Sequence, residues 1–203
     1  MTSLELGIHF LDQSFLEKRI DGLKLVSDAA AHCLSVWHDK SCELVSGKQN
    51  KSLEQKLKAA DNLAKKLEEG GAVLRKVFAK DRTHAQLVLR SEQLLRLLMY
   101  REALSSVDWE LLWEAGEING GELRVELFKV LIGAAPDMRL ADRQHIMLKI
   151  QSEKPENLTD RHVELAAEVC ATARKQGGDV NELESGVSLL WSIATESESH
   201  CAP

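Results

Sequence analysis

The chain has 203 residues, of which 44% are hydrophobic and 29% charged, and its formal net charge at pH 7 is -6. This balance is typical of a folded globular protein and argues against a disordered chain. The negative charge, with no dense run of Lys and Arg, argues against nucleic acid as a main partner, because phosphate binding requires a basic face.

The first predicted helix follows a Ser-x-x-Glu capping box at Ser14 to Glu17. Behind this box, Leu16, Ile20 and Leu23 fall on one stripe of a helix that we expect to end near Trp37. These three apolar residues are therefore predicted to belong to the core.

The next marks along the chain are a polar stretch and glycine pairs. Residues 45–52 are predicted to be a flexible joint, and a second capping box at 52–55 begins another helix. Gly70-Gly71 ends that helix, because glycine adopts the left-handed conformation of a helix end without steric cost. The same punctuation recurs at Gly120-Gly121 and Gly177-Gly178.

The remaining segments also have helical periodicity, and no window alternates like a strand. The predicted helices lie at 72–80, 83–103, 108–117, 121–134, 140–151, 158–176 and 182–196. The chain has only three prolines, which lets helices follow one another closely. We expect an all-α fold in which residues 1–203 form one array, with a disordered tail at 196–203.

Short turns between helices of this length favour stacked antiparallel pairs. Two echoing phrases, ELLWEAGEIN and GVSLLWSIAT, place Leu-Leu-Trp at Trp113 and Trp191. Their separation is close to twice the ~40-residue period of HEAT and armadillo repeats. An armadillo/HEAT-like α-α superhelix is the favoured architecture, and a closed helical bundle is the alternative.

The tryptophans are the sharpest candidates for core or contact positions. A Trp after two leucines usually fills the gap between paired helices, so Trp113 and Trp191 are predicted to be core residues, together with Leu127 and Leu190.

Trp37 and Trp109 lie nearer the predicted helix ends. Binding surfaces are enriched in tryptophan, so we expect these two side chains to be exposed and available to a protein partner.

A metal site is disfavoured by the spacing of the cysteines. Cys33, His38 and Cys42, with His32 beside them, are the nearest approach to one. Structural zinc requires four ligands, usually as closely spaced pairs, and no second pair follows. Buried thiols and surface histidines are the favoured interpretation, and we expect no metal or cofactor.

Three segments combine Asp, Arg and His, starting at Asp81, Asp142 and Asp160. Each falls where a helix is predicted to begin, and an aspartate there caps exposed backbone N–H groups. A thiol nucleophile requires a histidine close to it in space, and the sequence leaves such a pairing of Cys170 open. The surrounding AAEVCATA, however, does not resemble an exposed nucleophile turn. We expect no catalytic residue in this chain.

The compartment is indicated by what is missing. No apolar run approaches the ~20 residues that cross a bilayer, and MTSLELGIHF lacks a basic leader before an apolar block. The four cysteines have no disulfide-framework spacing. We expect a cytoplasmic protein with reduced thiols and no membrane partner.

Several of these phrases resemble a known family. The segments 15–24 and 113–116, the latter followed by a Val- and Leu-rich helix at 123–132, and the segment 187–194 are similar to stretches of the large fat facets-type ubiquitin-specific proteases. The landmarks occur in the same order and together cover most of residues 15 to 195.

The resemblance implies that the chain belongs to the non-catalytic helical superhelix upstream of the protease domain of a ubiquitin thiolesterase. The catalytic boxes of the family are not found here, because the four cysteines lie in HCL, SCE, VCA and HCA and the only tyrosine is Tyr100. It further implies a scaffold or substrate-recruitment module in ubiquitin-dependent turnover, with ubiquitinated substrates or the parent protease domain as protein partners. The alternatives are a stand-alone helical adaptor unrelated to ubiquitin and a small helical-bundle enzyme or metal protein.

Overall fold

The computed structural model describes residues 2–46, 51–68 and 72–178, together with Gly186, Ser188 and Trp191. Within these residues every regular element is a helix, which confirms the predicted all-α class. The elements in chain order are α1 (Ser3–Leu11), α2 (Leu16–Ser46), α3 (Lys51–Glu68), α4 (Ala72–Phe78), α5 (Ala85–Arg90), α6 (Glu92–Tyr100), α7 (Ser106–Gly116), α8 (Ile118–Ala134), the 3-10 helix η1 (Ala135–Asp137), α9 (Leu140–Ser152), the 3-10 helix η2 (Pro155–Asn157) and α10 (Asp160–Lys175).

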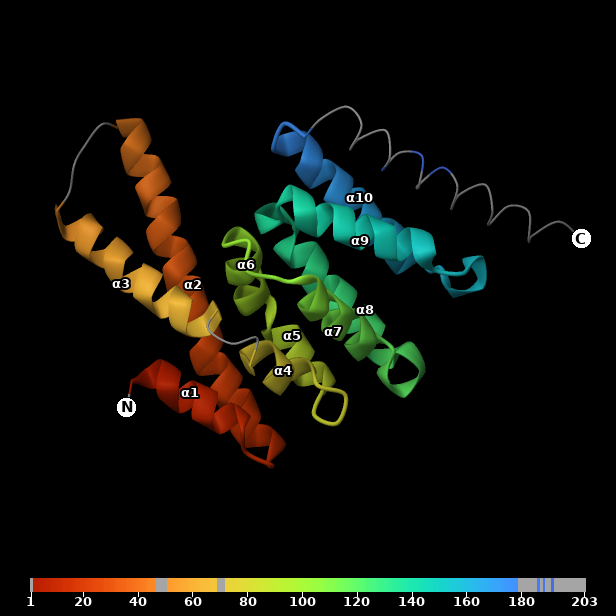
Figure 1. Ribbon diagram of the computed structural model, residues 1–203, viewed down its shortest axis with the longest axis horizontal. Coiled ribbons are helices and arrows are strands. Elements are labelled where there is room, and N and C mark those ends of the chain that lie inside the picture. The colour runs from red at the N-terminus through yellow and green to blue at the C-terminus, as the bar shows by residue number, and fades with distance from the viewer. Residues whose placement is uncertain are drawn as a thin grey trace, which may run out of the picture.

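The N-terminal helices α1, α2 and α3 lie on one side of the molecule, and α7 to α10 lie on the other, with α4, α5 and α6 between them (Figure 1). Helix α1 begins with a capping box, in which Thr2 and Glu5 satisfy each other's backbone N–H groups. It packs against α2 at a close crossing, because a Cβ added to Gly22 would lie 2.6 Å from the carbonyl oxygen of Gly7. Two glycines therefore set the distance between these helices.

Helix α2 differs from its prediction at both ends. It begins at Leu16, so Phe15 rather than Ser14 precedes the helix, and no hydrogen bond joins Ser14 to Glu17 among the described side chains. The helix continues past Trp37 to Ser46. Trp37 consequently lies within a long helix rather than near its end.

The predicted helix 83–103 is two helices, α5 and α6, separated at Ser91. The Ser91 side chain is buried and its hydroxyl donates to the carbonyl of Val88 at 2.6 Å. A serine that bonds the preceding turn in this way competes with the helical hydrogen-bond pattern. The chain can therefore change direction there without a glycine or proline.

Two consecutive helix pairs follow, α7 with α8 and α9 with α10, and α8 also packs against α5, α6 and α10. The end of α10 agrees with the glycine signal in the sequence. Gly177 has φ +73°, and the N–H groups of Gly177 and Gly178 donate to the carbonyls of Arg174 and Ala173. This pattern of bonds is the Schellman motif.

One continuous apolar core runs through the described helices, from Leu4 in α1 to Val169 in α10. Among the predicted core residues, Leu23 and Leu127 are fully buried, whereas Leu16, Ile20 and Trp113 are half-buried against the core. Leu190 lies outside the described residues, as do the predicted tail and residues 47–50 of the predicted joint.

The prediction for Trp191 is wrong, because its side chain is 72% exposed. Gly186, five residues earlier, is buried, and an added Cβ there would overlap the Cys170 sulfur. Residues five apart on a helix point roughly 140° away from each other. A helical residue five positions beyond such a contact therefore faces away from it.

Candidate functional site

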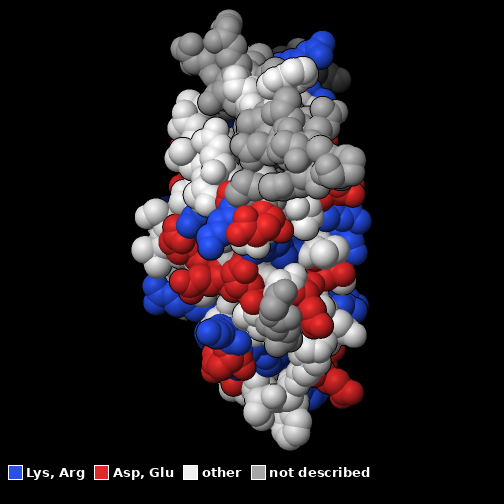
Figure 2. Space-filling model, turned by 90° about the vertical axis from the view of Figure 1, so that its right-hand side faces the viewer, with Lys and Arg blue, Asp and Glu red and all other residues white. Residues whose placement is uncertain are grey.

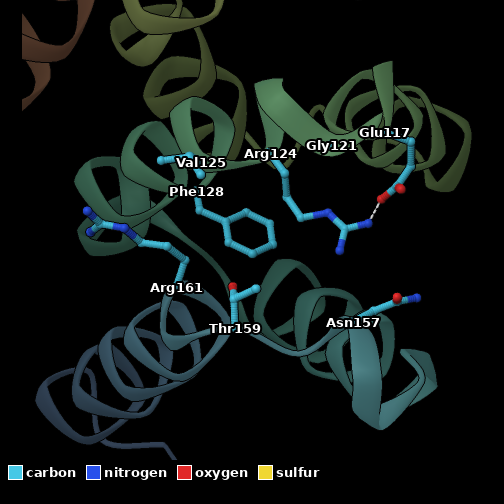
Figure 3. Close-up of a pocket in the computed structure, with 8 residues that line it drawn as sticks. All are labelled: Glu117, Gly121, Arg124, Val125, Phe128, Asn157, Thr159 and Arg161. Carbon is cyan, nitrogen blue, oxygen red and sulfur yellow. Dashed lines mark ion pairs between the residues drawn. The ribbon is translucent and has the colours of Figure 1, made fainter. Parts of the chain in front are cut away.

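The two helix pairs leave a pocket of about 280 Å³ between them, at the end where each pair has its turn (Figure 3). The first pair contributes side chains from its turn and from the first half of α8, and the second contributes side chains from η2 and the start of α10. The α7–α8 side of the pocket consists of Glu117, Gly121, Arg124, Val125 and Phe128. The other side consists of Asn157, Thr159 and Arg161.

The turn that forms one wall is unusually short. Glu117 is both the residue that ends α7 and the residue that precedes α8. Gly121 has φ +89°, in a region that residues with a side chain rarely adopt, although an added Cβ would meet no atom within 4 Å. Glycine is required there by the backbone conformation rather than by the available space.

Arg124 is the charged group at the centre of the pocket. Its guanidinium forms ion pairs with Glu117 and, at 3.7 Å, with Glu153, and its side chain is only 15% exposed. Glu153 in turn accepts a hydrogen bond from the indole N–H of Trp113 at 3.1 Å. Figure 3 shows Arg124 pointing toward Glu117, whereas the guanidinium of Arg161 points away from the pocket. The Arg161 guanidinium donates a hydrogen bond to the carboxylate of Glu164.

Beneath the opposite wall lies a buried histidine. The Nδ1 atom of His162 accepts a hydrogen bond from the backbone N–H of Thr159 at 3.1 Å, which caps the start of α10. The ring also lies edge-on to Phe128, with the ring centres 4.8 Å apart. Burial, with the nearby charge of Arg124, lowers the pKa of His162 to about 4. The imidazole is therefore neutral at physiological pH.

The Thr159 hydroxyl lies 3.0 Å from the same Nδ1 atom. A hydroxyl beside an imidazole is one requirement for an activated nucleophile. A general base works best when its pKa is near the working pH, and the lowered pKa of His162 makes it a weak base. The contact between Thr159 and His162 is explained by helix capping at the start of α10.

The charge around the pocket is mixed. Figure 2 views the side on which the α7–α8 turn and the α9–α10 connection lie, and acidic side chains gather across the middle of this face with Lys and Arg among them. Of the two guanidinium groups that line the pocket, that of Arg124 is the more covered from water, with its side chain 15% exposed against 40% for Arg161.

A second hollow, of about 400 Å³, lies between α1, α2 and α3. Its floor is apolar, from Leu4, Leu25 and Leu63, and the polar side chains of Asp28 and His32 that also line it are exposed. Thr2, which also lines it, is engaged in the capping box with Glu5, and none of the described charged side chains that line this hollow is buried, so the pocket around Arg124 is the stronger candidate site.

Trp37 and Trp109 were predicted to be exposed, and the structure places both in the interior. Trp37 is 6% exposed and stacks on Tyr100, with the ring centres 5.3 Å apart. Trp109 is 3% exposed, and its indole N–H donates to Asp142 of α9 at 3.3 Å. The prediction failed because α2 extends beyond Trp37 and because α9 lies against the first turn of α7.

The bond from Trp109 to Asp142 belongs to a seam of side-chain contacts between α7 and α9. Farther along the same two helices, Trp113 donates to Glu153 and Lys149 pairs with Glu110 at 2.5 Å. We call these three contacts the α7–α9 seam. It joins one helix pair to the next and ends at the pocket, since Glu153 also holds Arg124.

The three Asp-Arg-His segments are not brought together as one site. Asp142 accepts the backbone N–H of Arg139 at the start of α9, and Asp160 is the first residue of α10, as expected for helix starts. Asp81 lies in the turn before α5, where His84 rather than an aspartate is the capping residue.

Of the four residues considered for a zinc site, Cys33, His32 and His38 are described, whereas the side chain of Cys42 lies outside the described part of the structure. Cys33 is buried, its thiol donates to the carbonyl of Ala60, and His32 and His38 are exposed. Within the described part of the chain, no three His, Cys, Asp or Glu side chains come together as metal ligands.

The pocket residues were missed at the level of sequence. Arg124, Asn157 and Thr159 come from separate elements, and no spacing in the chain predicts that they meet. The capping box at Thr159 has a histidine at its third following position, where Glu or Gln is usual. The sequence therefore did not predict that His162 is a buried capping residue.

Comparison with known proteins gives no relative: no protein family, no curated protein and no solved structure matches the chain. None of the described helices combines the length and apolar character that crossing a membrane requires.

Proposed function

We propose that the chain is a non-catalytic, protein-binding helical scaffold, and that a partner protein contacts it around the pocket between the two helix pairs. The observation that carries the proposal is the pocket itself, in which Arg124 is held in place by Glu153 at the end of the α7–α9 seam. A polar group fixed before binding loses little freedom when a partner arrives, which favours recognition.

The stacking of successive pairs supports an armadillo/HEAT-like array as the architecture of this scaffold. In such arrays each pair contacts its neighbours, and the surface formed by several pairs serves to bind proteins. The parallel run of contacts between α7 and α9 is the relation expected of the first helices of neighbouring repeats.

The parent context is proposed from the resemblance alone. On that basis the scaffold recruits ubiquitinated substrates, or contacts the protease domain, within a large cysteine-type deubiquitinase. The alternative is a stand-alone adaptor with no connection to ubiquitin. An antibody raised to this chain distinguishes them on a denaturing gel of source cells, because a band far above 22.6 kDa supports the first and a band at 22.6 kDa supports the second.

The binding surface is tested by Val125→Asp, with Val107→Asp as its matched control. Both valines are exposed, but Val125 lines the pocket and Val107 lies in the first turn of α7. Purified chain immobilised on beads is expected to lose its captured proteins from a lysate of source cells with Val125→Asp only. Equal capture by both variants, with unchanged circular dichroism, contradicts the proposed surface.

A further inference from the structure

We propose that the pocket binds an acidic side chain of the partner protein, which pairs with Arg124 and displaces Glu117 from it. This inference deepens the proposed function and rests on it, because it names the chemistry that the scaffold recognises. It makes Glu117 an internal substitute for the ligand.

Arg124 fits the role of a fixed receptor for a carboxylate. Its guanidinium has five N–H donors in a planar fork, so Glu153 alone cannot satisfy it. Glu153 is 13% exposed and is also bonded to Trp113, which fixes one side of the guanidinium. The side that faces Glu117 is the one open to exchange.

Glu117 differs from Glu153 in being replaceable. Its side chain is 50% exposed and it lies at the junction of two helices rather than within one. Ion pairs at such exposure contribute little net stability, because water solvates the separated charges almost as well. Replacing Glu117 by another carboxylate therefore costs little beyond the freedom lost by the ligand.

The other walls favour an acidic group over a neutral one. Thr159 precedes the N-terminal end of α10, a helix of 16 residues whose dipole is positive there, and Asp160 in its first turn offsets part of that positive potential. Phe128 is 1% exposed and forms an apolar floor, which reduces the screening of an ion pair formed above it. The carboxylate of Glu117, which lines the pocket and pairs with Arg124, shows that this guanidinium accepts a glutamate side chain as its partner.

The first experiment titrates the whole chain with three blocked amino acids of nearly identical shape. N-acetyl-glutamic acid amide carries a side-chain carboxylate, N-acetyl-glutamine carries only a terminal one, and N-acetyl-glutamine amide carries neither. The readout is the Nε–H resonance of Arg124 in a nitrogen–proton NMR spectrum. We expect the first compound to shift this resonance most, the second less, and the third not at all.

Equal shifts with the neutral compound overturn the proposal, and so does an unmoved Arg124 resonance with all three. Larger shifts with N-acetyl-glutamine overturn the choice of a side chain as the source and indicate a carboxyl terminus. Loss of the shifts in high salt supports the ionic contact, because salt screens it.

Glu117→Gln then tests the displacement. Removal of the internal carboxylate is expected to tighten binding of N-acetyl-glutamic acid amide by about two- to fivefold, the factor that an exposed ion pair represents. Glu126→Gln is the control, since it removes an exposed pair with Lys129 on the same helix away from the pocket. Unchanged or weaker binding by Glu117→Gln overturns the displacement step.

The two proposals fail in different ways. If the small carboxylates do not bind but Val125→Asp still abolishes protein capture, the acidic-ligand inference fails and the scaffold function stands. If the carboxylates bind but capture is the same for both valine variants, the pocket is a ligand site and the proposed docking surface is wrong.

Discussion

Helices α1 and α2 meet backbone to backbone, whereas α7 and α9 meet through long side chains. At the first contact, Gly7 and Gly22 leave no room for a methyl group. At the second, Trp109 and Trp113 reach across to Asp142 and Glu153. The first arrangement is therefore vulnerable to added atoms, and the second to the removal of a group or to a change in its charge.

The largest expected effect is on the second region, from Trp109→Ala. The side chain is 3% exposed, so its removal leaves a cavity and deprives Asp142 of a donor. We expect a loss of about 3–5 kcal/mol in the free energy of unfolding, measured by urea denaturation.

Trp191→Ala is the matched control for this measurement. Because the Trp191 side chain is 72% exposed, we expect the loss to be below about 1 kcal/mol. If the two variants unfold at the same urea concentration, the assignment of Trp109 to the seam is in error.

Acid should next separate the two regions. The folded state holds the pKa of His162 at about 4, below its ordinary value of 6.5, so the unfolded chain binds a proton more readily between these values. Stability contributed by the neutral imidazole is complete above pH 6.5 and is lost as the pH falls to 4, by on the order of 3 kcal/mol. Thermal melts at half-unit intervals of pH measure this loss.

His162→Gln provides the comparison, because Gln at this position of a capping box can still accept the N–H of Thr159 but does not titrate. We expect a flatter stability profile between pH 6.5 and 4. In the first region, Glu5 accepts the N–H of Thr2 and pairs with Lys66, which lowers its pKa to about 2. Its contribution is lost only below about pH 4.5, so the two regions weaken in different windows.

The close crossing is tested by Gly22→Ala. The added methyl would lie within 3.0 Å of backbone or Cβ atoms of Gly7, Phe10 and Leu11, which cannot yield as a flexible side chain can. We expect a loss of about 1–3 kcal/mol, measured by urea denaturation.

Gly133→Ala is its control in the second region. There the nearest atoms belong to the flexible carboxylate end of Glu92, and alanine favours a helix over glycine. No loss, or a gain of up to about 1 kcal/mol, is expected. A similar cost at both glycines would mean that the α1–α2 crossing is not specially tight.

The smallest effect is expected from Lys66→Met. The Lys66–Glu5 pair joins α3 to α1 at 3.0 Å, but both side chains are nearly half exposed. We expect a change below about 1 kcal/mol that disappears in high salt, measured by the same urea titration. A larger loss would show that this bridge, and not the glycine crossing, holds the N-terminal helices together.

The difference between the regions also explains which parts of the molecule can be predicted from sequence. Local signals act within a few residues, so most of the helices, the glycine end of α10 and the helix starts at Asp142 and Asp160 follow from spacing. The helix α1 was overlooked although Thr2-Ser-Leu-Glu5 is a regular capping box.

Exposure of the tryptophans does not follow in the same way. Which face of a helix is covered depends on the elements that reach it from elsewhere, such as α9 over Trp109, or Gly186 against Cys170. The pocket forms only where side chains from the start of α8, from η2 and from the start of α10 come together. The pattern of a single sequence predicts which face of a helix is apolar, but it does not predict which other element packs against that face.

The buried thiol of Cys33 has a practical consequence for following the motions of the molecule. Its hydrogen bond to Ala60 joins α2 to α3, and burial raises its pKa to about 11. The thiolate is the form of cysteine that attacks an alkylating reagent, so this sulfur reacts only after α3 has moved away from α2. The rate at which a mass-labelled reagent modifies Cys33 therefore reports how often these two helices separate.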